Sequence, residues 1–159
     1  MTTIQSGTPM TVTDSRGGTI YGLSSSTAQL CPGMTYGNMA SKGDMGSRLG
    51  GAAGGQGYFN KAAFCNVPTV GNGTGFGSTG IGTILGPDRF NFDTAVTKST
   101  QVGGFHEDAR LEFRAEFFNL FNHTQFSNPA TANGVSTFGQ ITTTSVNSKL
   151  IQLALKYIF

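Results

Sequence analysis

Residues 110–117 alternate strictly between two kinds of side chain, and this pattern constrains the fold more than any other feature of the sequence. Every second residue is apolar, and the residues between them are charged, with signs that alternate along the chain. The apolar set is Leu111, Phe113, Ala115 and Phe117, and the charged set is Arg110, Glu112, Arg114 and Glu116. A helix would wrap the apolar set around its axis, whereas a β-strand places that set on one face. The pattern therefore predicts a strand with one apolar and one ionised face.

Two further segments show the same period of two. Residues 90–97 alternate between larger apolar or branched residues and small or polar ones, and the last residues of the chain alternate as well. The larger residues of the C-terminal segment are Ile151, Leu153, Leu155, Tyr157 and Phe159. Residues 101–108 contain paired glycines and read as a turn, so we expect segments 90–98 and 109–120 to pair as antiparallel strands. The predicted fold class is all-β, an antiparallel up-and-down meander.

The strands of soluble β-sandwiches also alternate between apolar and polar residues, so alternation alone does not show whether the apolar face meets a protein core or lipid. The segments 109–119 and 149–159 are each 11 residues long, whereas soluble strands usually have about 5–6 residues and a bilayer crossing needs about 9–11. The charged face suits a barrel lumen, and aromatic residues at strand ends suit interfacial girdles. These aromatic residues are Phe117, Phe118, Phe121, Tyr157 and Phe159. We therefore expect the apolar set to face lipid and the charged set to face the lumen.

Composition divides the chain into two parts. Residues 1–87 hold 20 of the 24 glycines but only 14 Leu, Ile, Val and Phe residues, whereas residues 88–159 hold 22 of the latter. A segment so poor in large apolar residues is not expected to bury a core of its own. The composition predicts a partial barrel strand at 1–14, a long loop rich in Gly, Ser and Thr at 15–87, and the C-terminal barrel strands at 88–159.

The two cysteines, Cys31 and Cys65, both lie in the glycine-rich part. They are either two free thiols or, in an oxidising compartment, a disulfide. The sequence contains no CxxC motif and no Cys-His pairing, which argues against a zinc site. The net charge is only +2 and the ten basic residues are scattered, which argues against a nucleic-acid partner. No apolar run approaches 18 residues, so we expect no transmembrane helix.

Three motifs could indicate a catalytic, cofactor or metal site, but each has a simpler explanation. Residues 75–80 match GxGxxG, but the following residues, IGTILGP, do not form the helix that dinucleotide binding needs. His106, Glu107 and Asp108 are consecutive in a turn, so they cannot easily converge on one ion. Glu112 and Glu116 are interleaved with arginines, so charge pairing explains them better than acid–base catalysis. We therefore expect no enzyme activity, no cofactor and no metal site.

A family resemblance extends over essentially the whole chain. The run RLEFRAEFFNLFNHTQFSNP at residues 110–129, preceded by GPDRFNFD at 86–93, resembles the end of TonB-dependent outer-membrane receptors. The most similar group is the Oar-like β-barrels of the acidobacterial type. Residues 5–18 and 136–159 resemble an upstream strand and the final hairpin of the same proteins.

The resemblance implies a location, partners and a topology. It implies the outer membrane of a Gram-negative bacterium, contact with membrane lipid, and recognition by the barrel-assembly machinery of the alternating C-terminal residues that end on Phe159. Further implied partners are the remaining receptor barrel, its plug and, through the part of the receptor before this chain, the energy-coupling protein. With Phe159 at the periplasmic rim, the turn at 101–108 is periplasmic, and residues 15–87 and 123–148 are extracellular.

The chain is far shorter than the receptors that it resembles. Such transporters have about 22 strands, so we expect this chain to be the C-terminal part of a longer receptor, without transport activity of its own. The alternative left open is a secreted or surface-displayed β-rich module whose loop binds a ligand. A soluble module of this kind would cover the apolar face, whereas a barrel would leave it open to lipid.

Overall fold

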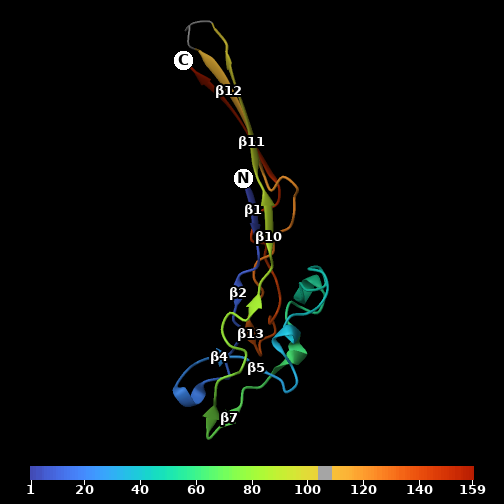
Figure 1. Ribbon diagram of the computed structural model, residues 1–159. Coiled ribbons are helices and arrows are strands. Elements are labelled where there is room, and N and C mark those ends of the chain that lie inside the picture. The colour runs from blue at the N-terminus through green and yellow to red at the C-terminus, as the bar shows by residue number, and fades with distance from the viewer. Residues whose placement is uncertain (104–108) are drawn as a thin grey trace. The chain divides into compact units, whose positions relative to one another are not determined.

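The computed structural model describes residues 1–103 and 109–159, which form β-strands, loops and short 3₁₀ helices (Figure 1). The predicted all-β fold class is confirmed. The chain divides into two compact units. The sheet unit comprises Met1–Gln5, Asp88–Gln125 and Thr144–Phe159, and the glycine-rich unit comprises Ser6–Pro87 and Phe126–Thr143. No helix among the described residues is long and apolar enough to cross a membrane.

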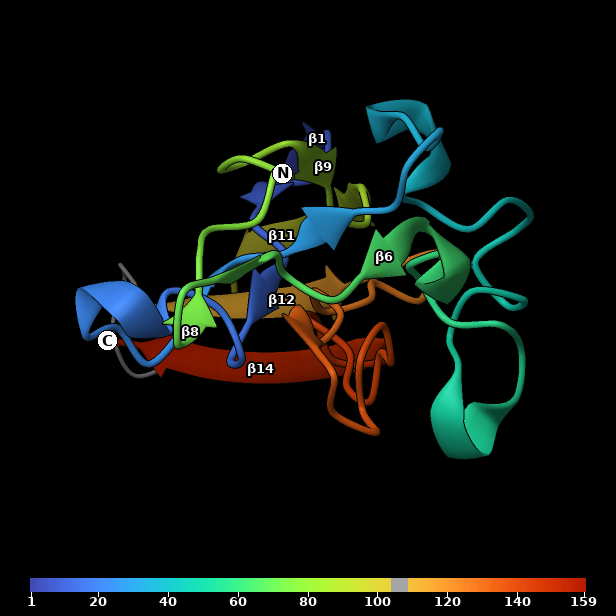
Figure 2. The same ribbon diagram turned by 90° about the horizontal axis from the view of Figure 1, so that it is seen from below.

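The sheet unit is built from five strands. They are β1 (Thr2–Gln5), β10 (Arg89–Phe92), β11 (Thr94–Gln101), β12 (Arg110–Phe118) and β14 (Leu150–Ile158). β11, β12 and β14 form an antiparallel sheet in this order, and β1 pairs antiparallel with β10. Figure 2 shows the three long strands side by side. The predicted antiparallel pairing of the segments 90–98 and 109–120 is confirmed over the whole of β11, which pairs with β12.

Two details of the long strands differ from the prediction. β12 and β14 have nine residues each rather than 11, because the ladder between them ends at Phe118. The strand expected over 90–98 is divided at Asp93, where the pairing partner changes from β1 to β12. The Asp93 carboxylate accepts a hydrogen bond of 2.8 Å from the backbone N–H of Asn119. This hydrogen bond links the break between β10 and β11 to the residue that follows β12.

Very short elements make up the glycine-rich unit. Its strands are β2 (Pro9–Met10), β3 (Thr13–Asp14), β4 (Ser26–Thr27), β5 (Gln29–Leu30), β6 (Phe64–Cys65), β7 (Thr69–Val70), β8 (Gly73–Thr74), β9 (Ile84–Leu85) and β13 (Ala132–Asn133). Its 3₁₀ helices are η1 (Thr19–Tyr21), η2 (Tyr36–Asn38), η3 (Gly51–Ala53) and η4 (Lys61–Ala63). The sheets are β13-β3-β4, β2-β9, β5-β6 and β7-β8, and β13 runs parallel to β3 whereas the other pairs are antiparallel.

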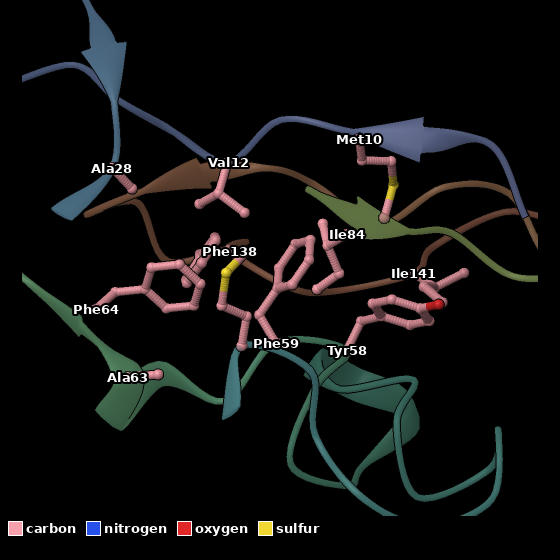
Figure 3. Close-up of a cluster of buried hydrophobic side chains, with 11 residues drawn as sticks. Met10, Val12, Ala28, Tyr58, Phe59, Ala63, Phe64, Ile84, Phe138 and Ile141 are labelled. Atoms are coloured by element: carbon pink, nitrogen blue, oxygen red, sulfur yellow. The ribbon is translucent and has the colours of Figure 1, made fainter. Parts of the chain in front are cut away.

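A hydrophobic core lies inside this unit, although residues 1–87 were not expected to bury a core of their own (Figure 3). Phe59 is fully buried, and its ring stacks on that of Phe138 with centroids 5.1 Å apart and meets Phe64 edge-on at 6.3 Å. The other members are Met10, Val12, Ala28, Met39, Tyr58, Ala63, Ile84 and Ile141. Five members are Met, Ala or Tyr, which the count of Leu, Ile, Val and Phe omitted. Phe138 and Ile141 come from the segment 126–143, so the core is shared between distant parts of the chain.

The disulfide and one close backbone approach hold this unit together. Cys31 and Cys65 form a disulfide, with Cα atoms 4.9 Å apart, beside the paired strands β5 and β6. The structure thus has the paired form of the two alternatives that the sequence left open. The Gly77 N–H donates to the carbonyl of Thr27, and a Cβ at Gly77 would lie 2.1 Å from the carbonyl oxygen of Ala28. Only glycine fits there, because any side chain would overlap the backbone.

A buried carboxylate links three further segments of the glycine-rich unit. The Arg16 guanidinium donates to both carboxylate oxygens of Asp14, at 2.8 and 2.6 Å, and to the side-chain oxygen of Asn66 at 2.6 Å. The Asn133 amide donates to Asp14 at 3.0 Å. Burial alone would raise the pKa of Asp14, but the hydrogen bonds from Arg16 and its positive charge outweigh burial. They hold the pKa of Asp14 below its ordinary value of 3.8.

Candidate membrane-facing sheet

The apolar residues of β12 and β14 share one side of the three-stranded sheet. Directly opposed residues of antiparallel strands point to the same face. The register opposes Leu111 to Tyr157, Phe113 to Leu155, Ala115 to Leu153, and Phe117 to Ile151. We call these eight residues the apolar face. It contains the whole apolar set of β12 that the sequence grouped together.

This apolar face is open rather than covered. Phe113 is 42 % exposed, Leu153 is 65 % exposed and Leu155 is 67 % exposed. A soluble sandwich packs a second sheet about 10 Å above such a face. A contiguous exposed apolar surface indicates a membrane or a partner. The exposure of the apolar face therefore favours the barrel interpretation over a soluble module.

The charged residues of β12 occupy the opposite side of the sheet. Arg110, Glu112, Arg114 and Glu116 alternate with the residues of the apolar face. The Arg114 guanidinium forms an ion pair with the Glu116 carboxylate at 2.5 Å, and the register opposes Glu112 to Lys156. Opposite charges across a ladder stabilise a sheet. The ion pair with Arg114 therefore accounts for the Glu116 carboxylate, and Glu112 has a cationic residue directly across the ladder.

Aromatic pairs lie at both ends of the long strands. Near the C-terminus, the rings of Tyr157 and Phe159 stack with centroids 5.9 Å apart. Near the other end, the rings of Phe92 and Phe121 lie 5.5 Å apart at an angle of 44°. Two aromatic levels separated by an apolar band are the arrangement found at the two interfaces of a transmembrane barrel.

β11 differs from its neighbours because it is polar on both sides. Its residues opposite the apolar set of β12 are Thr94, Val96, Lys98 and Thr100. Lys98 lies directly opposite Phe113 and is exposed. The alternation predicted over residues 90–97 puts Lys98 on the same side as Val96, but it does not indicate which residues of β12 stand beside it. The register between β11 and β12 places it opposite Phe113.

Asn119 ends β12 and was also missed by the sequence analysis. Its backbone is left-handed, with φ 48°, a conformation that Asn adopts more readily than most residues. Its side-chain amide donates to the carbonyls of His123 and Asn147, both at 3.1 Å, and its side-chain oxygen accepts from the His123 N–H at 3.0 Å. An Asn directly after an apolar strand is the signal that could have indicated this turn. The network joins the end of β12 to the segment that leads into β14.

β14 carries the residues expected to form the barrel-assembly signal. Ile151, Leu153, Leu155 and Tyr157 lie on the apolar face, and Phe159 directly follows the strand. β12 pairs with one edge of β14, and no other strand among the described residues pairs with its second edge. A free edge offers backbone N–H and C=O groups for the addition of another strand.

The motifs that the sequence analysis set aside add no site. Residues 75–80 follow the two-residue strand β8, and the next described element after them is the strand β9. His106, Glu107 and Asp108 lie outside the described residues. Within 1–103 and 109–159, no group of three or more His, Cys, Asp and Glu residues could hold a metal ion. The two sides of the sheet are therefore the candidate functional surfaces.

Comparison with known protein families decides between the two interpretations of the sheet. The model of an outer membrane beta barrel domain matches residues 1–152. The chain belongs to this family. The family places this barrel protein in the outer membrane of Gram-negative bacteria, which confirms the predicted location. No curated protein and no solved structure matches the chain.

Proposed function

We propose that this barrel chain supplies the last strands of an outer-membrane receptor of the TonB-dependent, Oar-like kind. The observation that carries the proposal is the two-sided character of β12, with an open apolar face and a paired ionic face. In the proposed barrel, the apolar face contacts lipid and the charged residues face the lumen. The nine residues of β12 and of β14 are enough to cross a bilayer at a tilt.

The proposed topology follows from the direction of β14. With Phe159 at the periplasmic rim, the turn at residues 101–108 is periplasmic, and the glycine-rich unit is extracellular. The disulfide between Cys31 and Cys65 supports a location of this unit outside the cytoplasm, because disulfides persist in oxidising compartments. An extracellular unit held by a core and a disulfide resists unfolding where no chaperone or reductant acts on it.

The partners of the chain follow from its two unpaired strand edges. β11 and β14 each lack a strand on one side among the described residues, and a lipid-facing barrel has at least about eight strands. The remaining receptor barrel would pair with these edges, and the barrel-assembly machinery would first read β14. The plug and the energy-coupling protein would act through the rest of the receptor, so this chain alone has no transport and no enzyme activity.

An antibody against the glycine-rich unit tests the proposal in cells that make the protein. The expected result is a heat-modifiable band in the outer-membrane fraction, much larger than the 16.6 kDa of this chain. The same band should cross-link to the energy-coupling protein. A 16.6 kDa species released into the medium would instead support the ligand-binding module, and a large outer-membrane band without the cross-link would refute the TonB-dependent role.

A further inference from the structure

Lys98 is the one ammonium group that the β11–β12 register places beside the apolar face, and it needs an anion. It stands opposite Phe113, which in turn stands opposite Leu155. The two ion pairs between described residues are Asp14–Arg16 and Arg114–Glu116, and neither involves Lys98. A charged group among side chains that face hydrocarbon is stable only where it can reach water or a counter-ion.

The side chain of Lys98 can reach one membrane surface, although its backbone lies near the middle of β11. A Lys or Arg that faces lipid costs much less near the interface than at the bilayer midplane. Lys98 lies three residues before the end of β11 at Gln101, which is about 10 Å along a strand and less in depth for a tilted strand. A lysine side chain spans much of this depth by snorkelling toward the headgroups.

The neighbouring residues mark the same end of the sheet as an interface. Thr100, one step closer to the strand end, lies opposite Leu111, which lies opposite Tyr157. Tyr157 stacks on Phe159 at this end, and tyrosine is typical of the headgroup level. A cation, a hydroxyl and an aromatic pair therefore lie together on the lipid side, near the C-terminus of the chain.

We propose that Lys98 binds the phosphate of a glycerophospholipid headgroup, with the Thr100 hydroxyl beside it. The lipid belongs to the leaflet at the C-terminal end of β14, which is the periplasmic leaflet in the proposed topology. The assignment rests on the proposed function, since it requires the apolar face to contact lipid. The assignment goes beyond the proposed function in two ways. It names the residue that fixes the depth of the barrel in the membrane, and it names the ligand that this residue prefers, an anionic headgroup.

The experiment uses the complete receptor barrel that contains this chain, reconstituted in vesicles, with a single tryptophan as reporter. The chain itself contains no Trp, so once tryptophans elsewhere in the barrel are replaced by Phe, Phe113→Trp places a unique fluorophore opposite Lys98. Vesicles of phosphatidylcholine receive either brominated phosphatidylglycerol or brominated phosphatidylcholine, and quenching by each lipid gives the preference of the site. One cation near the surface contributes about 1 kcal/mol toward anionic lipid, so we expect an approximately fivefold preference for phosphatidylglycerol.

Matched variants assign that preference to Lys98. In the reporter background, Lys98→Gln should lower the preference to about one, and Lys98→Arg should keep it. Lys156→Gln removes the same charge from the opposite side of the sheet, where Lys156 stands across from Glu112, so it should leave the preference unchanged.

Two kinds of contrary result are distinguishable. Quenching by both lipids with no preference, or an equal loss in the Lys98 and Lys156 variants, would overturn the headgroup site but leave the lipid-facing assignment intact. No quenching by either lipid would overturn the lipid-facing assignment itself, and the headgroup site with it.

Discussion

Replacing Phe113 by Arg separates a membrane-facing sheet from a soluble one. Phe113 lies in the interior of β12 and on its apolar face. The cost of an arginine that faces lipid rises from about 0–1 kcal/mol near the interface to about 2–4 kcal/mol at the midplane, and Phe113 lies level with Lys98, between these depths. The new arginine would also stand opposite Lys98, and like charges across a ladder add up to about 1 kcal/mol. We therefore expect a loss of about 1–4 kcal/mol in the free energy of unfolding from the bilayer.

Arg114→Gln is the matched control because it changes the adjacent residue on the opposite side. It removes the ion pair with Glu116, in which the Arg114 side chain is 52 % exposed, and an exposed pair contributes about 0–1 kcal/mol. Both substitutions are made in the complete receptor barrel, which is titrated with urea in vesicles. The folded fraction is read from heat-modifiable gel migration.

The comparison of the two variants has a clear opposite outcome. If the apolar face met water instead of lipid, Phe113→Arg would cost little more than the control, because the side chain is already 42 % exposed. Equal shifts for the two variants would therefore refute the assignment of the two faces.

Two further predictions concern the glycine-rich unit. Replacing Cys31 and Cys65 by Ser opens a loop of about 35 residues and should lower the stability of this unit by about 3–4 kcal/mol in the chain-entropy model. Urea unfolding with and without reductant measures this loss, and a change below about 1 kcal/mol would contradict the prediction. The folded pKa of Asp14 lies below its ordinary value, so its stabilisation is complete above the unfolded pKa of about 3.9 and is lost as the pH falls through the folded pKa. Asp14→Asn should lower the free energy of unfolding by about 1–3 kcal/mol at pH 7 and weaken the loss of stability at acid pH, as measured by protease resistance between pH 7 and pH 3. If the variant lost stability at acid pH as steeply as the unchanged protein, Asp14 would not have this role.

The long strands were predictable from the sequence, whereas the division at Asp93 was not. Alternation in residues 110–117 and in the C-terminal segment is a local property, so the sequence alone indicates both strands and their faces. The division at Asp93 depends on β1 as a second partner and on the hydrogen bond from Asn119. Both are long-range contacts that no local pattern reveals.

The core of the glycine-rich unit was hidden for a related reason. Phe59 and Phe138 stack although they lie far apart in the sequence, and the surrounding elements are too short to show any period. The neighbours of Lys98 in the sheet were also hidden. β11 itself is mostly polar, and only its register with β12 places Lys98 beside Phe113. In each case the missing information is a pairing between segments, not a property of one segment.

A tryptophan scan along residues 110–117 tests whether one side of β12 meets the membrane. Each of eight variants of the complete receptor barrel carries one Trp in this chain, which otherwise has none; tryptophans elsewhere in the barrel are replaced by Phe, and each variant is reconstituted in vesicles with lipid brominated in its acyl chains. We expect strong quenching by brominated lipid at positions 111, 113, 115 and 117, and quenching only by aqueous acrylamide at 110, 112, 114 and 116. Equal quenching at odd and even positions, or access to water on both faces, would contradict the claim that one side of β12 meets the membrane.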